Sequence, residues 1–171
     1  MKKVDFTRNL SIKKLNPNNP LDTGLIEALE QDELINGKNG YLWALSNNLK
    51  DVSYLRHNSL LNSSYAIYHG KNPIGFLEIS DIFKTPDIWS VNLCYALHKT
   101  ARKKGYMRTV LTEVSDMILK ENQGIDTITL MIAPSNEKSI LTAEASGFIS
   151  DDLIEEEYQE QGYVIYQKMR K

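Results

Sequence analysis

The segment Trp89–His98 alternates two kinds of side chain with period two, which is typical of a β-strand. The large and apolar set consists of Trp89, Val91, Leu93, Tyr95 and Leu97. The small or polar set consists of Ser90, Asn92, Cys94, Ala96 and His98. We expect the large set to pack on a hydrophobic core. A small, polar face is what a strand carries where a ligand or another backbone approaches it closely.

Strands and helices alternate after this segment. Apolar residues recur at helical spacing from Met107 to Ile118, and the polar stretch 122–124 predicts the end of that helix. A buried strand is predicted at Thr127–Ala133, followed by a short helix that opens at Asn136 and closes at Gly147. Tyr163–Tyr166 is the last predicted strand.

The first half of the chain has a different pattern. It predicts a strand at Leu10–Leu15, short helices around Leu25–Leu29 and Leu42–Val52, and a hairpin of Ser64–Tyr68 with Ile74–Ile79. A loop from Asn16 to Pro20 closes the first strand. Strands and helices interleave only in the second half, so we expect an α/β (α+β) fold with a mixed, mainly antiparallel sheet flanked by helices.

Composition limits the classes of partner. A chain of 171 residues is expected to form one domain, 1–171. Its net charge of −2 argues against nucleic acid or an anionic membrane as a partner. The single cysteine, Cys94, excludes an intramolecular disulfide. Neither His57 nor His69 has an acidic or histidine partner at metal-ligand spacing, so we expect no metal. Without a signal-like or membrane-spanning segment, the expected location is cytoplasmic.

A basic loop joins the Trp89–His98 strand to the next helix. Its cations are Lys99, Arg102, Lys103, Lys104 and Arg108. The first turn of a helix has unpaired N–H groups, and a glycine such as Gly105 lets a ligand approach the backbone, so this loop is a candidate phosphate site. A solvated basic loop is the alternative, and these residues alone leave both interpretations open.

The loop resembles a known motif. The run 102–107, Arg-Lys-Lys-Gly-Tyr-Met, resembles the pyrophosphate loop of the GNAT superfamily of acetyl-CoA-dependent N-acetyltransferases, although Met107 stands where Gly or Ala is usual. A second block, Asn136–Ser139 followed by Ala143–Phe148, is similar to that family's Asn-x-x-Ser and Ala-Glu-x-x-Gly-Phe segments. Tyr95-Ala96-Leu97 is similar to the strand end of the branch that acetylates ribosomal-protein N-termini, the Rim-type branch.

The resemblance, which covers about residues 74–171, implies an architecture and a cofactor site. It implies one GNAT-like domain with splayed central strands, acceptor-side helices at about 20–57 and an acetyl-CoA-binding core at about 63–148. Backbone groups near Tyr95 and Leu97 would bind pantetheine, and the loop N–H groups would bind pyrophosphate. For Asn136 an N-cap role and a pantetheine contact both stay open. The implied cofactor-binding residues are Tyr95, Leu97, Arg102, Lys103, Lys104, Gly105, Tyr106, Met107, Arg108 and Asn136.

Acetyl transfer to an amine requires a base, an oxyanion donor and an acid for the departing thiolate. Many relatives use a tyrosine as the acid, and the matching residue here is Ala143. Ser139 stands where the ribosomal-protein branch carries a serine, so the resemblance implies that Ser139 is the acid, with hydrogen bonding inside a helix turn as the alternative. We assign the base role to Glu78, with an exposed strand carboxylate as the alternative.

The expected activity is transfer of an acetyl group from acetyl-CoA to a primary amine, directly in a ternary complex. The Rim-type resemblance suggests a protein N-terminal α-amine. A small-molecule amine (a polyamine, amino sugar or amino acid) is an alternative acceptor, and a non-catalytic acyl-CoA-binding module is an alternative function. The sequence leaves open the acceptor's identity and whether the protein is a monomer or a homodimer.

Overall fold

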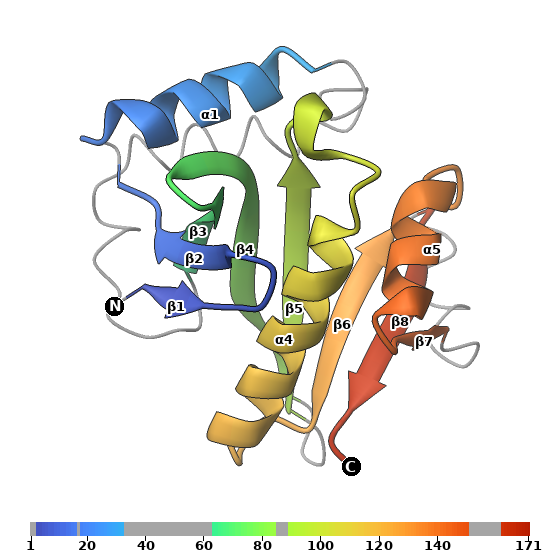
Figure 1. The fold of residues 1–171 in the computed structure, drawn as a ribbon. Coiled ribbons are helices and arrows are strands. Elements are labelled where there is room, and N and C mark those ends of the chain that lie inside the picture. The colour runs from blue at the N-terminus through green and yellow to red at the C-terminus, as the bar shows by residue number, and fades with distance from the viewer. Residues whose placement is uncertain (1–2, 17, 33–62, 85–88, 151–161) are drawn as a thin grey trace. The chain divides into compact units, whose positions relative to one another are not determined.

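The computed structural model describes residues 3–16, 18–32, 63–84, 89–150 and 162–171 (Figure 1). Its strands are β1 (Val4–Asp5), β2 (Leu10–Lys14), β3 (Ser63–His69), β4 (Asn72–Lys84), β5 (Trp89–Leu97), β6 (Thr127–Ile132), β7 (Ile149–Ser150) and β8 (Val164–Met169). Its helices are α1 (Pro20–Glu30), the short 3₁₀ turn η2 (Lys99–Ala101), α4 (Tyr106–Glu121) and α5 (Glu137–Ala145).

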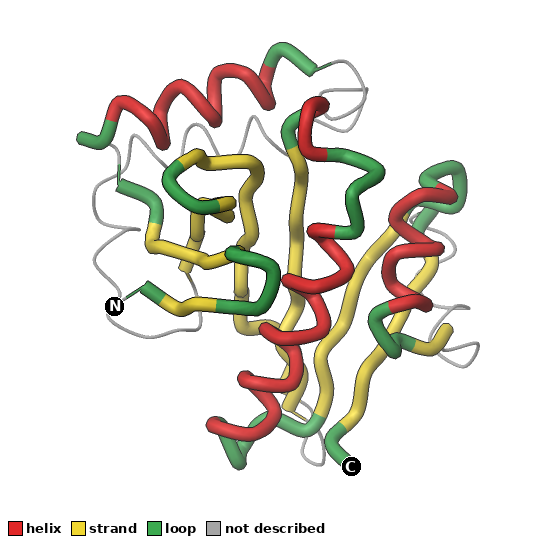
Figure 2. The backbone as a smooth tube through the Cα atoms, in the orientation of Figure 1, coloured by secondary structure: helices red, strands yellow, loops and turns green. Residues whose placement is uncertain are grey.

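The described strands form one sheet of eight in the order β1-β2-β3-β4-β5-β6-β8-β7. The registered pairs are antiparallel except that of β5 with β6, which is parallel. A parallel pair needs a crossover connection, and α4 supplies it between β5 and β6 (Figure 2). The predicted fold class, a mixed and mainly antiparallel sheet with helices, is confirmed.

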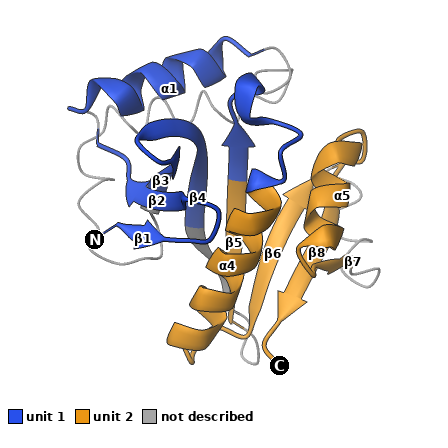
Figure 3. Ribbon diagram, viewed as in Figure 1, with its two compact units in different colours: residues 1–79, 95–106 blue, residues 80–94, 107–171 orange. Residues whose placement is uncertain are grey.

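The chain divides into two compact units (Figure 3). Unit 1 comprises residues 1–79 and 95–106, and unit 2 comprises residues 80–94 and 107–171. Strand β4 passes from unit 1 into unit 2, and β5 passes back from unit 2 into unit 1. The two units therefore share two strands of the same sheet, and each is described separately below.

The core of unit 1 lies between α1 and the sheet. Leu25, Ile26 and Leu29 of α1 are buried in one cluster with sheet residues such as Tyr68 and Phe76. The predicted helix around Leu25–Leu29 is confirmed, but it begins earlier than expected. Pro20 occupies the first turn, where its missing N–H costs nothing, and the Asn19 side chain caps the helix by accepting from the Leu21 N–H.

The core of unit 2 contains α4 and β6. The predicted apolar face of α4 is buried: Met107, Val110, Leu111, Val114 and Ile118 are at most 6% exposed. On β6 the alternate residues Ile128, Leu130 and Ile132 are buried, as the period-two pattern predicts. Lys168 of β8 is joined to α4 by a 2.8 Å hydrogen bond to Ser115 Oγ.

Two strands of the structure differ from the sequence prediction. Strand β1 was not predicted, because two paired residues are too short a run for a periodic signal. Strand β4 continues to Lys84, five residues past the predicted hairpin strand. The helix predicted at Leu42–Val52 lies outside the described residues. In the described part of the chain, no helix is long and apolar enough to span a bilayer.

Candidate functional site

The parallel pairing of β5 with β6 stops before either strand ends. Its register runs from Ser90↔Thr127 to Asn92↔Thr129, whereas β6 continues to pair with β8 as far as Ile132. This agrees with the expected splayed central strands. At the last register pair, the buried Oδ1 of Asn92 has no hydrogen-bond partner in the structure. A buried polar atom of this kind is costly, which marks the end of the pairing as a place for a polar ligand or water.

The last residues of β5 lie against β4 within unit 1. The His98 N–H donates to the Ile74 carbonyl at 2.8 Å. A Cβ on Gly75 would lie 2.5 Å from the Ala96 carbonyl oxygen and 2.6 Å from a side-chain carbon of Leu97. Only a glycine allows β4 to approach this closely, so Gly75 places the strand end that carries Tyr95 and Leu97. No local sequence pattern indicates this role for Gly75, because the close contact comes from another strand.

Part of the small face of β5 packs against the hydrophobic core. Ala96 packs against the hydrophobic cluster beneath α1, so at this position small size accommodates the core. Trp89, on the large face, is 45% exposed, which differs from the expected burial of that face. Val91 and Leu93 are buried as expected. Cys94 is half-buried.

Arg102 anchors the loop that follows β5. Its Nε donates to the Leu97 carbonyl at 3.0 Å, and its Nη2 lies 2.6 Å from Oδ2 of Asp32, just after α1. The Arg102 and Asp32 side chains are 25% and 11% exposed, so this ion pair is largely shielded from water. The Arg102 guanidinium thus holds the loop to unit 1, while Lys103 and Lys104 next to it are exposed.

The loop backbone then turns sharply into α4. Lys103 and Gly105 adopt positive φ angles of 62° and 72°. Turns of this kind direct successive N–H groups toward one side, which makes an anion-binding concavity. The helix that follows has 16 residues, and its first N–H groups lack partners within the helix. This backbone geometry is compatible with a phosphate, and phosphate binding by this loop stays a prediction.

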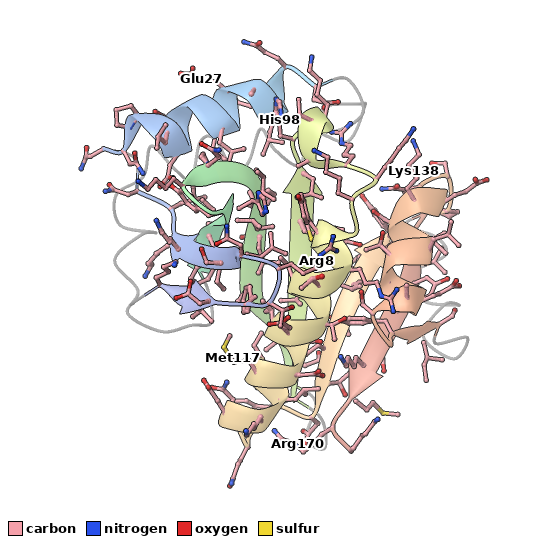
Figure 4. The ribbon with its side chains drawn as sticks, viewed as in Figure 1. Arg8, Glu27, His98, Met117, Lys138 and Arg170 are labelled. Atoms are coloured by element: carbon pink, nitrogen blue, oxygen red, sulfur yellow. The ribbon has the colours of Figure 1, made fainter. Side chains whose placement is uncertain are left out.

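Arg8 is a residue that the sequence analysis missed. It lies between β1 and β2, and its Nη2 donates to the Lys104 carbonyl at 2.9 Å (Arg8 is labelled in Figure 4). Its guanidinium lies 5.2 Å from the centre of the Tyr106 ring. The contact with Lys104 joins residues 96 positions apart in the chain, so no local pattern pointed to it.

Glu78 lies on β4, in the part of this strand that belongs to unit 1. It is 9% exposed, so the alternative that it is an exposed strand carboxylate is wrong. It stands opposite Ser64 in the register of β3 with β4, and Ser64 is 1% exposed with no hydrogen-bond partner for its Oγ. The alternation along β4 puts Glu78 on the same face as Phe76, which belongs to the cluster beneath α1.

Asn136 and Ser139 lie at the start of α5 in unit 2. Asn136 is the N-cap, and its side chain accepts from the Ser139 N–H at 3.3 Å, so its expected capping role is confirmed. Ser139 is half-buried and lies one turn before Ala143, which is fully buried. At the far end of α5, Ser146 Oγ lies 3.4 Å from the Arg108 carbonyl in the first turn of α4.

Within the described residues, no group of three or more His, Cys, Asp or Glu side chains is arranged to hold a metal ion.

The predicted site residues are divided between the two units. Unit 1 contains Glu78, Tyr95, Leu97, Arg102, Lys103, Lys104, Gly105 and Tyr106. Unit 2 contains Met107, Arg108, Asn136 and Ser139.

Solved structures of similar fold span almost the whole chain. A ribosomal-protein-S5-alanine acetyltransferase from Vibrio fischeri is 17% identical, with a TM-score of 0.69 over 99% of this chain and 97% of that one. RimL, a ribosomal L7/L12 alpha-N-protein acetyltransferase in complex with coenzyme A, is 13% identical, with a TM-score of 0.74 over 98% of both chains.

A third similar structure comes from a different kind of enzyme. The aminoglycoside acetyltransferase AAC(6')-Ib, in complex with paromomycin and acetyl-CoA, is 16% identical, with a TM-score of 0.70 over 95% of this chain and 94% of that one. At such identities these similarities show the fold.

No curated protein matches the sequence. The family model described as "Acetyltransferase (GNAT) domain" matches residues 25–149, which is most of the chain. The chain therefore belongs to the GNAT acetyltransferase family, whose enzymes are acetyl-CoA-dependent N-acetyltransferases.

Proposed function

We propose that this protein transfers the acetyl group of acetyl-CoA to the N-terminal α-amine of a protein, directly within a ternary complex. Two observations support this acceptor. The strand end Tyr95–Leu97 is similar to that of the Rim-type branch, and Ser139 stands where that branch carries a serine. Two ribosomal-protein acetyltransferases share the fold over nearly the full chain.

The observation that carries the cofactor assignment is the backbone of the loop before α4. Positive φ at Lys103 and Gly105 turns N–H groups toward one side, next to the positive end of a long helix. In this proposal the N–H groups from Lys103 to Arg108 bind the pyrophosphate, and the exposed Lys103 and Lys104 add charge. Arg102 contributes indirectly by anchoring the loop, because its guanidinium pairs with the Asp32 carboxylate and donates to the Leu97 carbonyl.

The pantetheine arm extends from the pyrophosphate toward the reacting thioester. Tyr95 and Leu97 contribute backbone groups to it, although the Leu97 carbonyl already accepts from Arg102. Asn136 contributes a contact in addition to its capping role. One N–H of β5 donates to the thioester carbonyl and stabilises the negative charge that develops on its oxygen during attack.

The transfer requires one base and one acid. The amine nitrogen attacks the thioester carbonyl carbon, the new C–N bond forms, and the C–S bond then breaks to release the CoA thiolate. Glu78 takes the proton that the amine loses, directly or through water. Ser139 gives a proton to the thiolate and recovers one from solvent. The partial exposure of Ser139, one turn from Ala143, is compatible with this role.

An aminoglycoside acetyltransferase of the same fold favours a second acceptor class. Its structure contains a small-molecule amine together with acetyl-CoA. The same chemistry therefore serves a polyamine, amino sugar or amino acid as the alternative acceptor. A non-catalytic acyl-CoA-binding module is the remaining alternative, and turnover measurements separate it from both enzymes.

Gly105→Asp tests the cofactor assignment. An aspartate side chain would place negative charge against the pyrophosphate, and φ at this position disfavours any side chain. We expect calorimetry to show loss of CoA binding in a variant that remains folded. Gly124→Asp is the matched control, because Gly124 is exposed and the nearest atom to its added Cβ would be 3.9 Å away. Equal CoA affinity of Gly105→Asp and the wild type would show that the loop is misassigned.

Thiol release then tests catalysis. Acetyl-CoA is incubated with peptides that have a free N-terminus and, separately, with polyamines, amino sugars and amino acids. Turnover with the peptides supports the proposed acceptor, and turnover with only the small amines supports the alternative. CoA binding without release of thiol from any amine supports the binding module.

A further inference from the structure

Arg8 lies outside the predicted site, yet it contacts the loop proposed to bind pyrophosphate. Both Arg8 and its neighbour Asn9 adopt positive φ, 59° and 57°, in the turn between β1 and β2. Such angles are uncommon for residues other than glycine and carry a conformational cost. The turn thus holds two successive residues in this unfavourable conformation. It directs the Arg8 side chain toward Lys104 in the loop before α4.

The Arg8 guanidinium lies next to three consecutive residues, Lys104, Gly105 and Tyr106. Nη2 donates to the Lys104 carbonyl at 2.9 Å. Nη1 lies 3.0 Å from the position that a Cβ of Gly105 would occupy. The guanidinium carbon lies 5.2 Å from the Tyr106 ring centre, within the range of a cation–π contact.

Two hairpin turns support this arrangement. The Gly70 N–H donates to the Asn9 carbonyl at 2.9 Å, which joins the β3–β4 turn to the β1–β2 turn. His69, beside Gly70, stacks on the Tyr106 ring with centroids 4.9 Å apart and planes 25° apart. Tyr106, which belongs to unit 1, therefore has contacts from both turns.

The hydrogen bond to Lys104 has a consequence for the next N–H group. The peptide bond between Lys104 and Gly105 is planar and trans, so the Lys104 carbonyl and the Gly105 N–H point in opposite directions. When Arg8 fixes the direction of the carbonyl, it also fixes the direction of the N–H. The Gly105 N–H then points away from Arg8.

We propose that Arg8 is a positioning residue for the cofactor. It holds the Lys104–Gly105 peptide plane so that the Gly105 N–H faces the pyrophosphate of acetyl-CoA. This inference rests on the proposed function of the loop. In this proposal Arg8 affects the affinity only for ligands that contain the pyrophosphate, because the pantetheine arm does not contact this peptide plane.

Arg8→Met tests the proposal with two ligands. The dissociation constant of CoA is measured by calorimetry, and that of pantetheine, which lacks the pyrophosphate, by ligand-observed NMR. We expect Arg8→Met to weaken CoA binding about tenfold, the scale of one charge-assisted hydrogen bond, and to leave pantetheine binding unchanged. Lys71→Met is the matched control, because it removes one exposed positive charge from the adjacent β3–β4 turn. We expect wild-type affinities for this control.

Arg8→Lys separates the geometry of the side chain from its charge. Lysine keeps the charge but lacks the planar fork that donates to Lys104 while lying over Tyr106. We expect Arg8→Lys to lose nearly as much CoA affinity as Arg8→Met. The losses of Arg8→Met and Tyr106→Leu should also be less than additive in the double variant, because both act through one contact.

Each contrary result has a distinct meaning. Equal losses for CoA and pantetheine would mean general damage to the fold and overturn the proposal. Wild-type CoA affinity in Arg8→Lys would mean that charge alone matters, which also overturns it. Unchanged CoA affinity in Arg8→Met, with loss in Gly105→Asp, would overturn this inference and leave the proposed function intact. Unchanged affinity in Gly105→Asp would overturn both.

Discussion

The Tyr68 side chain shows how one buried contact connects α1 to the sheet. Its hydroxyl donates to a carboxylate oxygen of Asp22, and the Asn19 side chain donates to it at 3.3 Å. Asp22 also accepts from the Asn16 N–H at 3.0 Å, so one carboxylate fixes both the loop before α1 and the helix itself. Burial, together with the hydrogen bond to the Asp22 carboxylate, raises the pKa of Tyr68 to about 12.

This raised pKa predicts a loss of stability in alkali. The unfolded chain loses the phenol proton near pH 10, whereas the folded chain keeps it to about pH 12. The stability that the protonated Tyr68 phenol contributes is therefore intact below pH 10. As pH rises from 10 to 12, the unfolding free energy falls by roughly 2–3 kcal/mol. Urea denaturation across this range should show a steeper decline in the wild type than in Tyr68→Phe. Parallel declines would contradict the assignment.

Gly75→Ala is expected to destabilise the protein by about 1–3 kcal/mol, the scale of overpacking against a fixed backbone. The added Cβ would lie 2.5 Å from the Ala96 carbonyl oxygen, so the end of β5 must shift. Gly24→Ala in α1 is the control, since no atom lies within 4 Å of its Cβ, and it should add about 1 kcal/mol of stability. Denaturation midpoints measure both, and equal effects would argue against the close approach at Gly75.

Ser139→Ala is expected to lower turnover more than CoA affinity, because the hydroxyl acts on the leaving thiolate and not on the bound cofactor. Single-turnover kinetics and calorimetry separate the two quantities. The opposite pattern, weaker CoA binding with normal turnover, would remove the acid role.

At the scale of elements, α5 shows a feature that the sequence predicted correctly. Asn136 at its start and Gly147 after its end, with φ of 85°, are local signals of capping. The faces of α4 and β6 were also predicted, because burial repeats with the period of the element. The anchoring of the loop before α4 was not predictable, since Arg8 and Asp32 reach it from distant parts of the chain.

The cap of α5 leads to a prediction that separates two roles of Asn136. Asn136→Ala removes the cap and should cost about 1 kcal/mol of unfolding free energy, whereas Asn136→Asp keeps an oxygen acceptor and should cost little. If Asn136 also contacts pantetheine through its amide N–H group, Asn136→Asp should still weaken CoA binding. Denaturation and calorimetry on both variants measure this, and unchanged CoA affinity in Asn136→Asp would limit Asn136 to capping.

At the scale of the whole molecule, two units share β4 and β5 within one sheet. The net charge of −2 averages over a cluster of cations around the loop after β5. The sequence was sufficient to predict the fold class, because strand alternation, helix periodicity and two family motifs agreed. It was not sufficient for Glu78, which is buried in a strand paired with β3, or for Gly75, where the close approach of β5 leaves no room for a side chain.

The most direct test of the central claim locates the transferred acetyl group. A peptide that has a free α-amine and one lysine is incubated with acetyl-CoA and this protein, and fragmentation mass spectrometry identifies the acetylated nitrogen. We predict one acetyl group on the α-amine, with one CoA thiol released per peptide and none in Gly105→Asp. Release of thiol only with small-molecule amines, or no release with any amine, would contradict the proposed function.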